Sequence, residues 1–276
     1  MALYLVATPI GNLEDITLRA IRVLREARLI ASEDTRTTQK LLNHYEIRTP
    51  IVSYFEHSSV SRLEHILREA EEADVALVSE AGMPGLSDPG FEVVRAAVAR
   101  NIRVIPVPGA NAVISALVAS GLASDRFLFL GFLPRRAADR RRLLAVTARE
   151  PHTLVFFESP HRLVASLSDM ALLLGNRRVA IARELTKVYE EIYRGTIEDA
   201  LAHFFQPRGE FTLVVEGYLE TPVLAGEKQV TEALSRAVGR GLSRRDAITQ
   251  VASELGLNKR EVYRVATSSL GPGDGE

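Results

Sequence analysis

The segment that decides the fold is LYLVATPIGNL, residues 3–13, in which an apolar run leads into a Pro-Gly turn. Runs that are apolar throughout are typical of strands that helices cover on both faces, as in a mainly parallel sheet. In open α/β sheets, ligands lie beyond the carboxyl ends of the strands, which is where this turn falls. Residues 3–7 therefore predict a buried strand, and the turn is a candidate ligand-binding loop. The alternative is an ordinary connection to a helix that Asp15 or Thr17 caps.

Strand and helix patterns alternate from this segment to about residue 216. The predicted strands are 3–7, 29–32, 51–54, 75–79, 103–106, 127–130, 153–158, 178–183, 190–195 and 211–216. The predicted helices are 18–27, 37–44, 61–72, 90–100, 110–120, 138–150, 161–174 and 197–204. A stretch with Pro and Gly at 221–226 is typical of a linker, helical periodicity covers 228–268, and residues 271–276 are expected to be disordered. The fold class is therefore α/β, with two α/β domains at 1–116 and 117–220 and a C-terminal helical module at 227–270.

The composition is that of an ordinary soluble globular protein, with 276 residues, 46% hydrophobic and 25% charged. No segment approaches the ~18 uncharged apolar residues of a membrane span, and the N-terminus shows no signal peptide. We therefore expect a cytoplasmic protein that does not contact membranes. Cysteine is absent and the six histidines show no HExxH or similar spacing, so neither thiolate chemistry nor a metal ion is expected.

Two further loops rich in glycine and proline follow predicted strands. Residues 80–90 have the sequence EAGMPGLSDPG, and residues 106–112 have the sequence PVPGANA. Such loops present backbone amide groups, and the carboxylates of residues 80–90 suit ribose hydroxyls or an amino group. Three such loops at strand ends favour a ligand site over plain connectors. No GxGxxG motif occurs, so neither the dinucleotide-binding fold nor the commonest Rossmann-type methyltransferase is indicated.

Five motifs carry a resemblance to a known family. They are TPIGNL at 8–13, SEDTR at 32–36, FLFLGFLP at 127–134, FESPHR at 157–162 and ARELTK at 182–187. The chain resembles the tetrapyrrole-methylase-like methyltransferases, in which two α/β domains hold S-adenosylmethionine in the cleft between them. Within this class the resemblance is closer to the branch that methylates small-subunit ribosomal RNA, and it covers essentially the whole chain.

The resemblance implies an enzyme that methylates the 2′-oxygen of a cytidine in the decoding region of small-subunit (16S) rRNA. It also implies a homodimer, with rRNA or the assembled small subunit as partner. Carried over by position, the residues expected to contact S-adenosylmethionine are Pro9, Ile10, Gly11, Glu80, Gly82, Met83, Asn111, Ala112 and Phe157. The family usually reads DAGTP where this chain reads EAGMP at 80–84, and YHEHN where it reads YFEHS at 54–58. The acidic side chain at position 80 is therefore one methylene longer, and a hydroxyl is lost at position 83.

Methyl transfer to a ribose hydroxyl requires an aligned nucleophile and either a general base or a cation that stabilises the developing alkoxide. The candidates in the matching motifs are Glu33, Asp34, Arg36, Glu158 and Lys187. Lys187 could act if burial lowered its pKa, or it could be a surface lysine paired with Glu184 or Glu190. Asp34 or Thr35 could instead be the N-cap of the following helix. The residues alone assign no single base.

Basic residues concentrate in two places, although the formal net charge of −1 does not by itself suggest nucleic acid. Six arginines fall between 135 and 149, and residues 228–264 carry eight Lys or Arg against four Asp or Glu in a helix-turn-helix-like pattern. Both suit phosphate contacts, but the first could be a solvated helix face and the second a dimerisation arm. The predicted RNA-binding residues are Arg135, Arg136, Arg140, Arg141, Arg142, Arg244, Arg245, Lys259 and Arg260.

Two other functions fit the same residues. A methylase of a small tetrapyrrole has the same fold, and the fold alone does not separate it from an RNA methyltransferase. The basic C-terminal module favours RNA, because a small substrate has no use for it. A non-catalytic nucleic-acid-binding protein would leave the three loops without a role, and failure to bind S-adenosylmethionine would support it.

Overall fold

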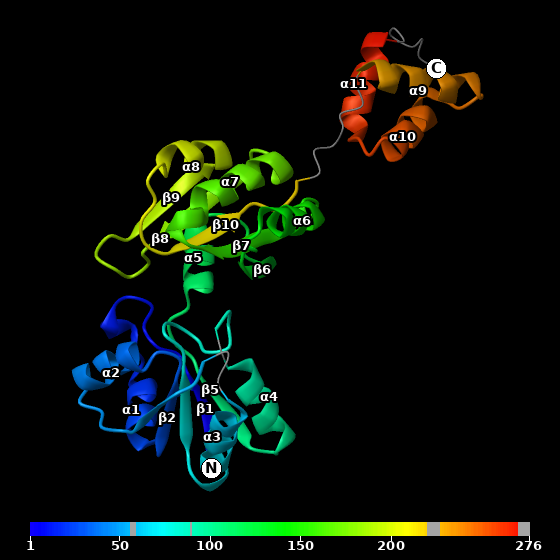
Figure 1. Ribbon diagram of the computed structural model, residues 1–276. Coiled ribbons are helices and arrows are strands. Elements are labelled where there is room, and N and C mark those ends of the chain that lie inside the picture. Colours follow the sequence, from blue (N-terminus) through cyan, green and yellow to red (C-terminus); the bar gives the residue numbers. More distant parts are fainter. Residues whose placement is uncertain (56–58, 89, 220–226, 270–276) are drawn as a thin grey trace. The chain divides into compact units, whose positions relative to one another are not determined.

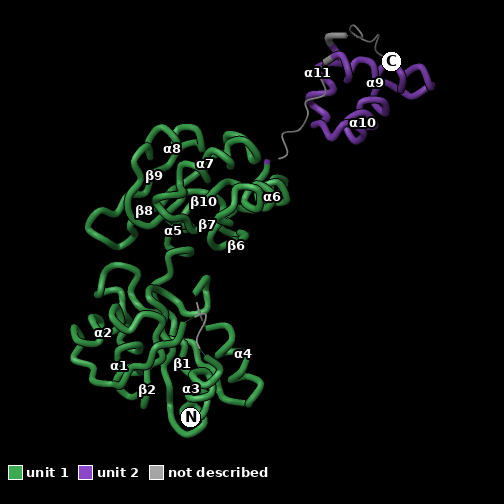
Figure 2. The backbone as a smooth tube through the Cα atoms, viewed as in Figure 1, with its two compact units in different colours: residues 1–218 green, residues 219–276 purple. Residues whose placement is uncertain are grey.

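The computed structural model describes residues 1–55, 59–88, 90–219 and 227–269. The chain forms two compact units, Met1–Tyr218 and Leu219–Glu276 (Figure 2). The linker predicted at 221–226, the tail predicted at 271–276 and part of the YFEHS segment lie outside the described residues. Within the described ranges, no helix is both long and apolar enough to cross a bilayer.

The first sheet of unit 1 is entirely parallel, with the strand order β3-β2-β4-β1-β5 (Figure 1). Its strands are β1 (Ala2–Val6), β2 (Leu29–Ser32), β3 (Ile51–Ser53), β4 (Val75–Val78) and β5 (Arg103–Val107). Its helices are α1 (Leu18–Glu26), α2 (Thr35–His44), α3 (Val60–Glu72) and α4 (Phe91–Ala99), with a short 3-10 helix, η1 (Leu13–Asp15). Side chains alternate along β1, so Leu3 packs with α3 and α4 on one face while Val6 packs with α1 on the other. The predicted parallel sheet with two covered faces is confirmed.

The second sheet of unit 1 is mixed, with the strand order β6-β7-β10-β8-β9. Its strands are β6 (Phe127–Phe132), β7 (Thr153–Glu158), β8 (Arg178–Arg183), β9 (Glu191–Thr196) and β10 (Phe211–Val215). Only β6 and β7 pair in parallel; β10 runs antiparallel to β7 and β8, and β9 runs antiparallel to β8. Helices α6 (Ala137–Thr147), α7 (Pro160–Leu174) and α8 (Ile197–His203) pack against one face, and α5 (Ala112–Ser120) packs against the other.

Strand β7 shows why this sheet is covered on both faces. Leu154 and Phe156 belong to the core beneath α6 and α7, whereas Val155 between them belongs to the core beneath α5. The boundary predicted at residue 116 falls inside α5, which packs on the second sheet. The division of unit 1 into two domains near that residue stays a prediction.

Unit 2 is a bundle of three helices, α9 (Glu227–Gly239), α10 (Arg244–Glu254) and α11 (Lys259–Ser269). Apolar residues at helical spacing, among them Leu234, Val251 and Val262, form its core. The hydroxyl of Ser243 accepts a hydrogen bond from the backbone N–H of Asp246 and so caps α10. The predicted helical module is confirmed in the described part of this unit.

Candidate active site

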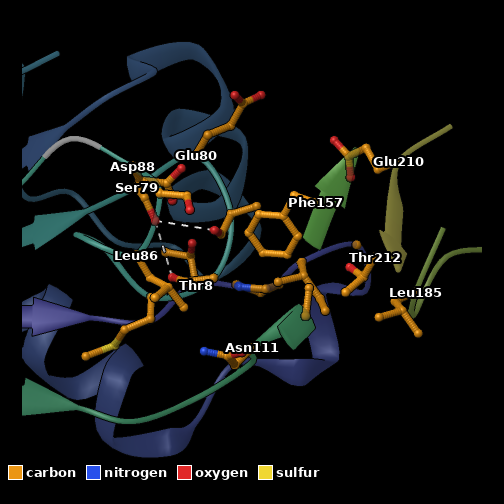
Figure 3. Close-up of a pocket in the computed structure, with 18 of the residues that line it drawn as sticks. Thr8, Ser79, Glu80, Leu86, Asp88, Asn111, Phe157, Leu185, Glu210 and Thr212 are labelled. Atoms are coloured by element: carbon orange, nitrogen blue, oxygen red, sulfur yellow. Dashed lines mark hydrogen bonds between the residues drawn. The ribbon is translucent and has the colours of Figure 1, made fainter. Parts of the chain in front are cut away.

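A cavity of about 800 Å³ lies in unit 1 and is lined by residues of both sheets. The first sheet contributes the residues that follow β1, β2, β4 and β5, and the second contributes the ends of β7, β8 and β10 (Figure 3). The volume falls within the roughly 300–1,000 Å³ that is usual for small-molecule sites. Its position at the carboxyl ends of parallel strands is the one expected for a ligand site in an α/β sheet.

All nine residues predicted to contact the cofactor line this one cavity. They are Pro9, Ile10, Gly11, Glu80, Gly82, Met83, Asn111, Ala112 and Phe157. The aromatic ring of Phe157 comes from the second sheet, while Asn111 lies after β5 and caps α5 through a hydrogen bond from Ile114 N–H. The three loops singled out in the sequence therefore converge, and their contact with a cofactor stays a prediction.

The loops after β1 and β4 are joined backbone to backbone. Thr8 N–H donates to Gly82 O at 2.9 Å, and Gly82 N–H donates to Thr8 O at 3.0 Å. Gly82 has a φ of 81°, which favours glycine, and a Cβ there would lie 3.3 Å from Cγ2 of Ile10. The hydroxyl oxygen of Thr8 is buried and has no hydrogen-bond partner among the described residues. A polar atom in this state is expected to bond to a ligand in the cavity.

The turn after β1 meets the loop after β8 at Gly11. A Cβ at Gly11 would lie 2.5 Å from Cγ of Lys187 and 2.9 Å from the carbonyl oxygen of Leu185, so only glycine fits. The next residue, Asn12, donates its backbone N–H to Oγ1 of Thr186 at 3.0 Å. Thr186 has a φ of 66°, an uncommon conformation for a residue with a side chain. The TPIGNL and ARELTK motifs thus form one wall of the cavity together.

Lys187 lies on this wall between two carboxylates. Its Nζ is 3.0 Å from Oε1 of Glu184 and 2.9 Å from Oε2 of Glu210. Burial acts to lower the pKa of Lys187, but the hydrogen bonds to Glu210 and Glu184 outweigh it, so the pKa is raised above its ordinary value. Lys187 is therefore a persistent cation, and the lowered pKa required for a lysine base is not met.

The second motif, SEDTR, divides between the cavity and a helix cap. Glu33 lines the cavity, whereas Asp34 and Arg36 are not among its lining residues. Asp34 is the N-cap of α2: its carboxylate accepts hydrogen bonds from the backbone N–H groups of Arg36, at 2.7 Å, and Thr37. These bonds, above all the one from Arg36, lower the pKa of Asp34. The capping alternative for Asp34 is the one that the structure shows.

Glu158 lines the cavity, but both of its carboxylate oxygens accept hydrogen bonds from the start and body of the following helix, α7. Oε2 accepts from Oγ of Ser166 at 2.5 Å, and Oε1 accepts from Ser159 N–H at 2.9 Å. Nε of Arg162 lies 3.4 Å from Oε1, and the Glu158 side chain is fully buried. These contacts fix the junction of β7 and α7, so Glu158 positions the wall on which Phe157 lies.

Asp88 is a cavity residue that the sequence did not single out by itself. It lies in the loop after β4 and lines the cavity with Ser79 and Glu80 (Figure 3). Burial raises the pKa of Asp88 to about 6; the charges of Glu33 and Glu80 add to the rise, and a hydrogen bond from Ser79 opposes it. The sequence signal for Asp88 is the SDPG end of the glycine-rich loop, in which the resemblance assigns only Glu80, Gly82 and Met83 to the cofactor.

The predicted RNA-binding arginines just before and within α6 do not share one environment. Arg135, Arg136 and Arg142 are exposed, whereas Arg140 is buried with its guanidinium 2.6 Å from Oδ2 of Asp169. Arg141 keeps more than half of its side chain exposed, but its Nε lies 2.7 Å from Oδ1 of Asp169. Although burial acts to raise the pKa of Asp169, hydrogen bonds from these two arginines lower it. Arg140 therefore ties α6 to α7 and is not accessible to phosphate.

The predicted RNA-binding residues of unit 2 lie mainly on its surface. Arg245, Lys259 and Arg260 are exposed, and Arg244 is half-buried with a hydrogen bond to the carbonyl oxygen of Ala266 at 2.8 Å. Three of the four cations in this set are therefore accessible to a partner.

The fold and the cavity define a protein of the tetrapyrrole methylase class. Residues 2–201 match the family of tetrapyrrole (corrin/porphyrin) methylases. A solved uroporphyrin-III C-methyl transferase from Thermus thermophilus, complexed with S-adenyl homocysteine, shares the fold with a TM-score of 0.55 and 22% identity over 78% of this chain and 97% of its own. A diphthine synthase structure gives a TM-score of 0.61 with 12% identity, over 80% and 92% of the two chains.

Within that class, the chain belongs to the ribosomal RNA small subunit methyltransferase I family. The protein of that name from Halalkalibacterium halodurans is 50% identical over 95% of this chain and 93% of its own length. That from Synechocystis sp. is 46% identical over 96% of both chains. That from Thermotoga maritima is 48% identical, with 98% of its length matching only 78% of this chain. The resemblance stated from the five motifs is confirmed.

Proposed function

We propose that this chain transfers the methyl group of S-adenosylmethionine to the 2′-oxygen of a cytidine in small-subunit rRNA. The observation that carries the proposal is the cavity between the two sheets, which all nine predicted cofactor residues line, in a chain half identical to a small-subunit rRNA methyltransferase. The cavity volume and the buried hydroxyl of Thr8 that lacks a partner fit a bound polar cofactor.

S-adenosylmethionine, when bound, supplies a methyl group that is already activated by the positive sulfur. The protein must then hold the ribose oxygen in line and exclude water. Phe157 packs edge-on against Phe129, with ring centroids 5.1 Å apart, and presents an apolar wall to the cavity. An apolar wall excludes water, and electrostatic interactions inside the site are stronger where water is excluded.

Lys187 stabilises negative charge in this scheme. Its raised pKa keeps the ammonium group protonated, so it can stabilise the alkoxide that develops on the ribose oxygen. Glu184 and Glu210 hold Nζ at the cavity wall. Lys187 is therefore assigned as a cation and not as the proton acceptor.

The exposed cations beside the cavity and on unit 2 are assigned to RNA. Arg135, Arg136 and Arg142 follow Phe132, which lines the cavity, so phosphates bound there would lie next to the site. The Thermotoga maritima relative matches a length close to that of unit 1 alone. We therefore assign the chemistry to unit 1 and a supplementary docking role to unit 2. In this proposal the protein is cytoplasmic, and it is homodimeric as the family resemblance implies.

The RNA surface is tested by the salt dependence of binding. Replacing Arg135, Arg136 and Arg142 together by alanine should weaken binding to rRNA and reduce the slope of log K against log salt by about 2–3, since each phosphate contact contributes about 0.7–0.9. A matched triple change of Arg22, Arg25 and Arg62, which lie on α1 and α3, serves as the control. An unaltered slope in the first variant would assign that run to a solvated helix face.

The function is tested by transfer of a labelled methyl group from S-adenosylmethionine to purified small subunits that lack the modification. The expected product, resolved by mass spectrometry of the nucleosides, is 2′-O-methylcytidine. Free rRNA is assayed in parallel to distinguish the two forms of substrate. Cofactor binding without transfer to either would favour the small-molecule methylase.

A further inference from the structure

Three carboxylates line one part of the cavity. We call Glu33, Glu80 and Asp88, which line it after β2 and β4, the acidic corner. Two of them act on the third, because the charges of Glu33 and Glu80 both raise the pKa of Asp88. Figure 3 shows Asp88 beside Ser79, with Glu80 in the same loop.

Glu158 and Glu210, the other two carboxylates of the cavity lining, each lie next to a cation. Glu158 is 3.4 Å from Nε of Arg162, and Glu210 is 2.9 Å from Nζ of Lys187. In the described part of the chain, the charges acting on Asp88 are those of carboxylates, and no cation is among them. Lys40 of α2 also lines the cavity. A positive charge bound in the cavity near Asp88 would therefore stabilise its ionised carboxylate.

A second observation points to a ligand at the same wall. Thr8, which is 3% exposed, lines the cavity and its hydroxyl oxygen has no partner among the described residues. Thr8 is joined by two backbone hydrogen bonds to Gly82, in the same loop as Glu80 and Asp88. In the described ranges, no group of three or more carboxylate or imidazole side chains is placed to hold a metal ion. The cation expected here is the organic one that the proposed function supplies.

We propose that Asp88, with Glu80 and Glu33, recognises the positive charge of S-adenosylmethionine and so distinguishes it from S-adenosylhomocysteine, whose sulfur is neutral. The inference rests on the proposed function, because it requires that the cofactor occupies this cavity. Transfer of the methyl group removes the positive charge from sulfur. The acidic corner then loses its counter-charge, which favours release of the product and entry of a new cofactor.

Binding of the cofactor is coupled to a proton in this scheme. Asp88 holds a proton in part of the molecules near pH 6, and a bound cation favours the ionised carboxylate. Each molecule that was protonated releases one proton to solvent when the cofactor binds. Affinity for S-adenosylmethionine should therefore be highest above pH 6 and should fall about fourfold between about pH 7.5 and about pH 5.5.

Isothermal titration calorimetry of the full chain with S-adenosylmethionine and with S-adenosylhomocysteine tests the inference. Asp88→Asn keeps the shape and removes the charge, and should weaken binding of S-adenosylmethionine about tenfold or more. Binding of S-adenosylhomocysteine should change less than about threefold, and the pH dependence should disappear. Asp125→Asn, the same change at an exposed aspartate outside the cavity lining, is the matched control and should behave as wild type.

The outcomes separate this inference from the function on which it rests. If wild-type protein binds neither ligand, the cofactor assignment fails and the inference fails with it. If wild type binds S-adenosylmethionine but Asp88→Asn weakens both ligands equally or neither, the inference alone is overturned. Thermal unfolding of each variant verifies that it is folded, and Asp88→Glu should restore most of the preference for the charged ligand.

Discussion

The ionised carboxylate of Asp88 is expected to destabilise the folded protein at neutral pH. Asp88→Asn should therefore raise the free energy of unfolding. The rise in pKa from an ordinary 3.8 to about 6 corresponds to at most about 3 kcal/mol at neutral pH. Asp88 is only half-buried, so solvent screening reduces the expected gain to about 1–2 kcal/mol. For a unit of this size each kcal/mol raises Tm by about 2–4 °C.

The stability gained by Asp88→Asn should depend on pH, and the raised pKa of Asp88 fixes the direction of that dependence. A carboxyl group whose pKa is raised by folding favours the folded state when it is protonated, so its contribution is fully present below pH 3.8 and is lost as pH rises through about 6. The asparagine variant never ionises, and its advantage should therefore be full at about pH 7.5 and roughly a third as large at about pH 4.5. Urea unfolding without cofactor at both pH values measures the difference in free energy of unfolding between the variant and wild type, with Asp125→Asn as control. An advantage that is absent at about pH 7.5, or equal at both pH values, would refute the reasoning.

Three further changes test other contacts. Gly11→Ala should weaken binding of S-adenosylmethionine at least about tenfold, because its Cβ would lie 2.5 Å from Cγ of Lys187 and overpacking costs about 1–3 kcal/mol; wild-type affinity by calorimetry, in a folded variant, would contradict this. Lys187→Met should lower kcat about 100-fold or more while cofactor affinity changes less than about threefold, and an unchanged rate of methyl transfer would remove Lys187 from the chemistry. Arg140→Ala should lower the free energy of unfolding by about 3 kcal/mol, the lower end for a buried ion pair, because a second arginine still reaches Asp169. Arg142→Ala should change the free energy of unfolding by less than about 0.5 kcal/mol. Equal urea midpoints for the two variants would contradict the different roles given to the two arginines.

The sequence predicted those features that local pattern controls. The apolar run of β1 and the glycine-rich loops after β1 and β4 are local signals, and the loops converge because parallel strands end at the same edge of the sheet. The N-cap at Asp34 was also foreseeable, since a short acidic side chain before a helical pattern is a capping signal. The direction of the strands in the second sheet was not, because apolar runs in parallel and antiparallel strands look alike.

Properties that depend on contacts between residues far apart in the sequence could not be predicted. Asp88 has its raised pKa because folding buries it and brings Glu33 near it, and neither fact is visible in the SDPG sequence. Arg140 looked like its neighbours in the basic run, but the helix turns it toward Asp169 on α7 while Arg142 faces solvent. Lys187 required its two carboxylate partners to be known before the direction of its pKa could be given.

The backbone bridge between Thr8 and Gly82 bears on how freely this part of the chain can diverge. The two loops are held together by main-chain N–H and C=O groups, which every residue except proline possesses. The loop after β4 can therefore exchange DAGTP for EAGMP and keep its path, provided that glycine stays at position 82, where φ is 81°. Divergence here alters which groups face the ligand and leaves the outline of the cavity in place.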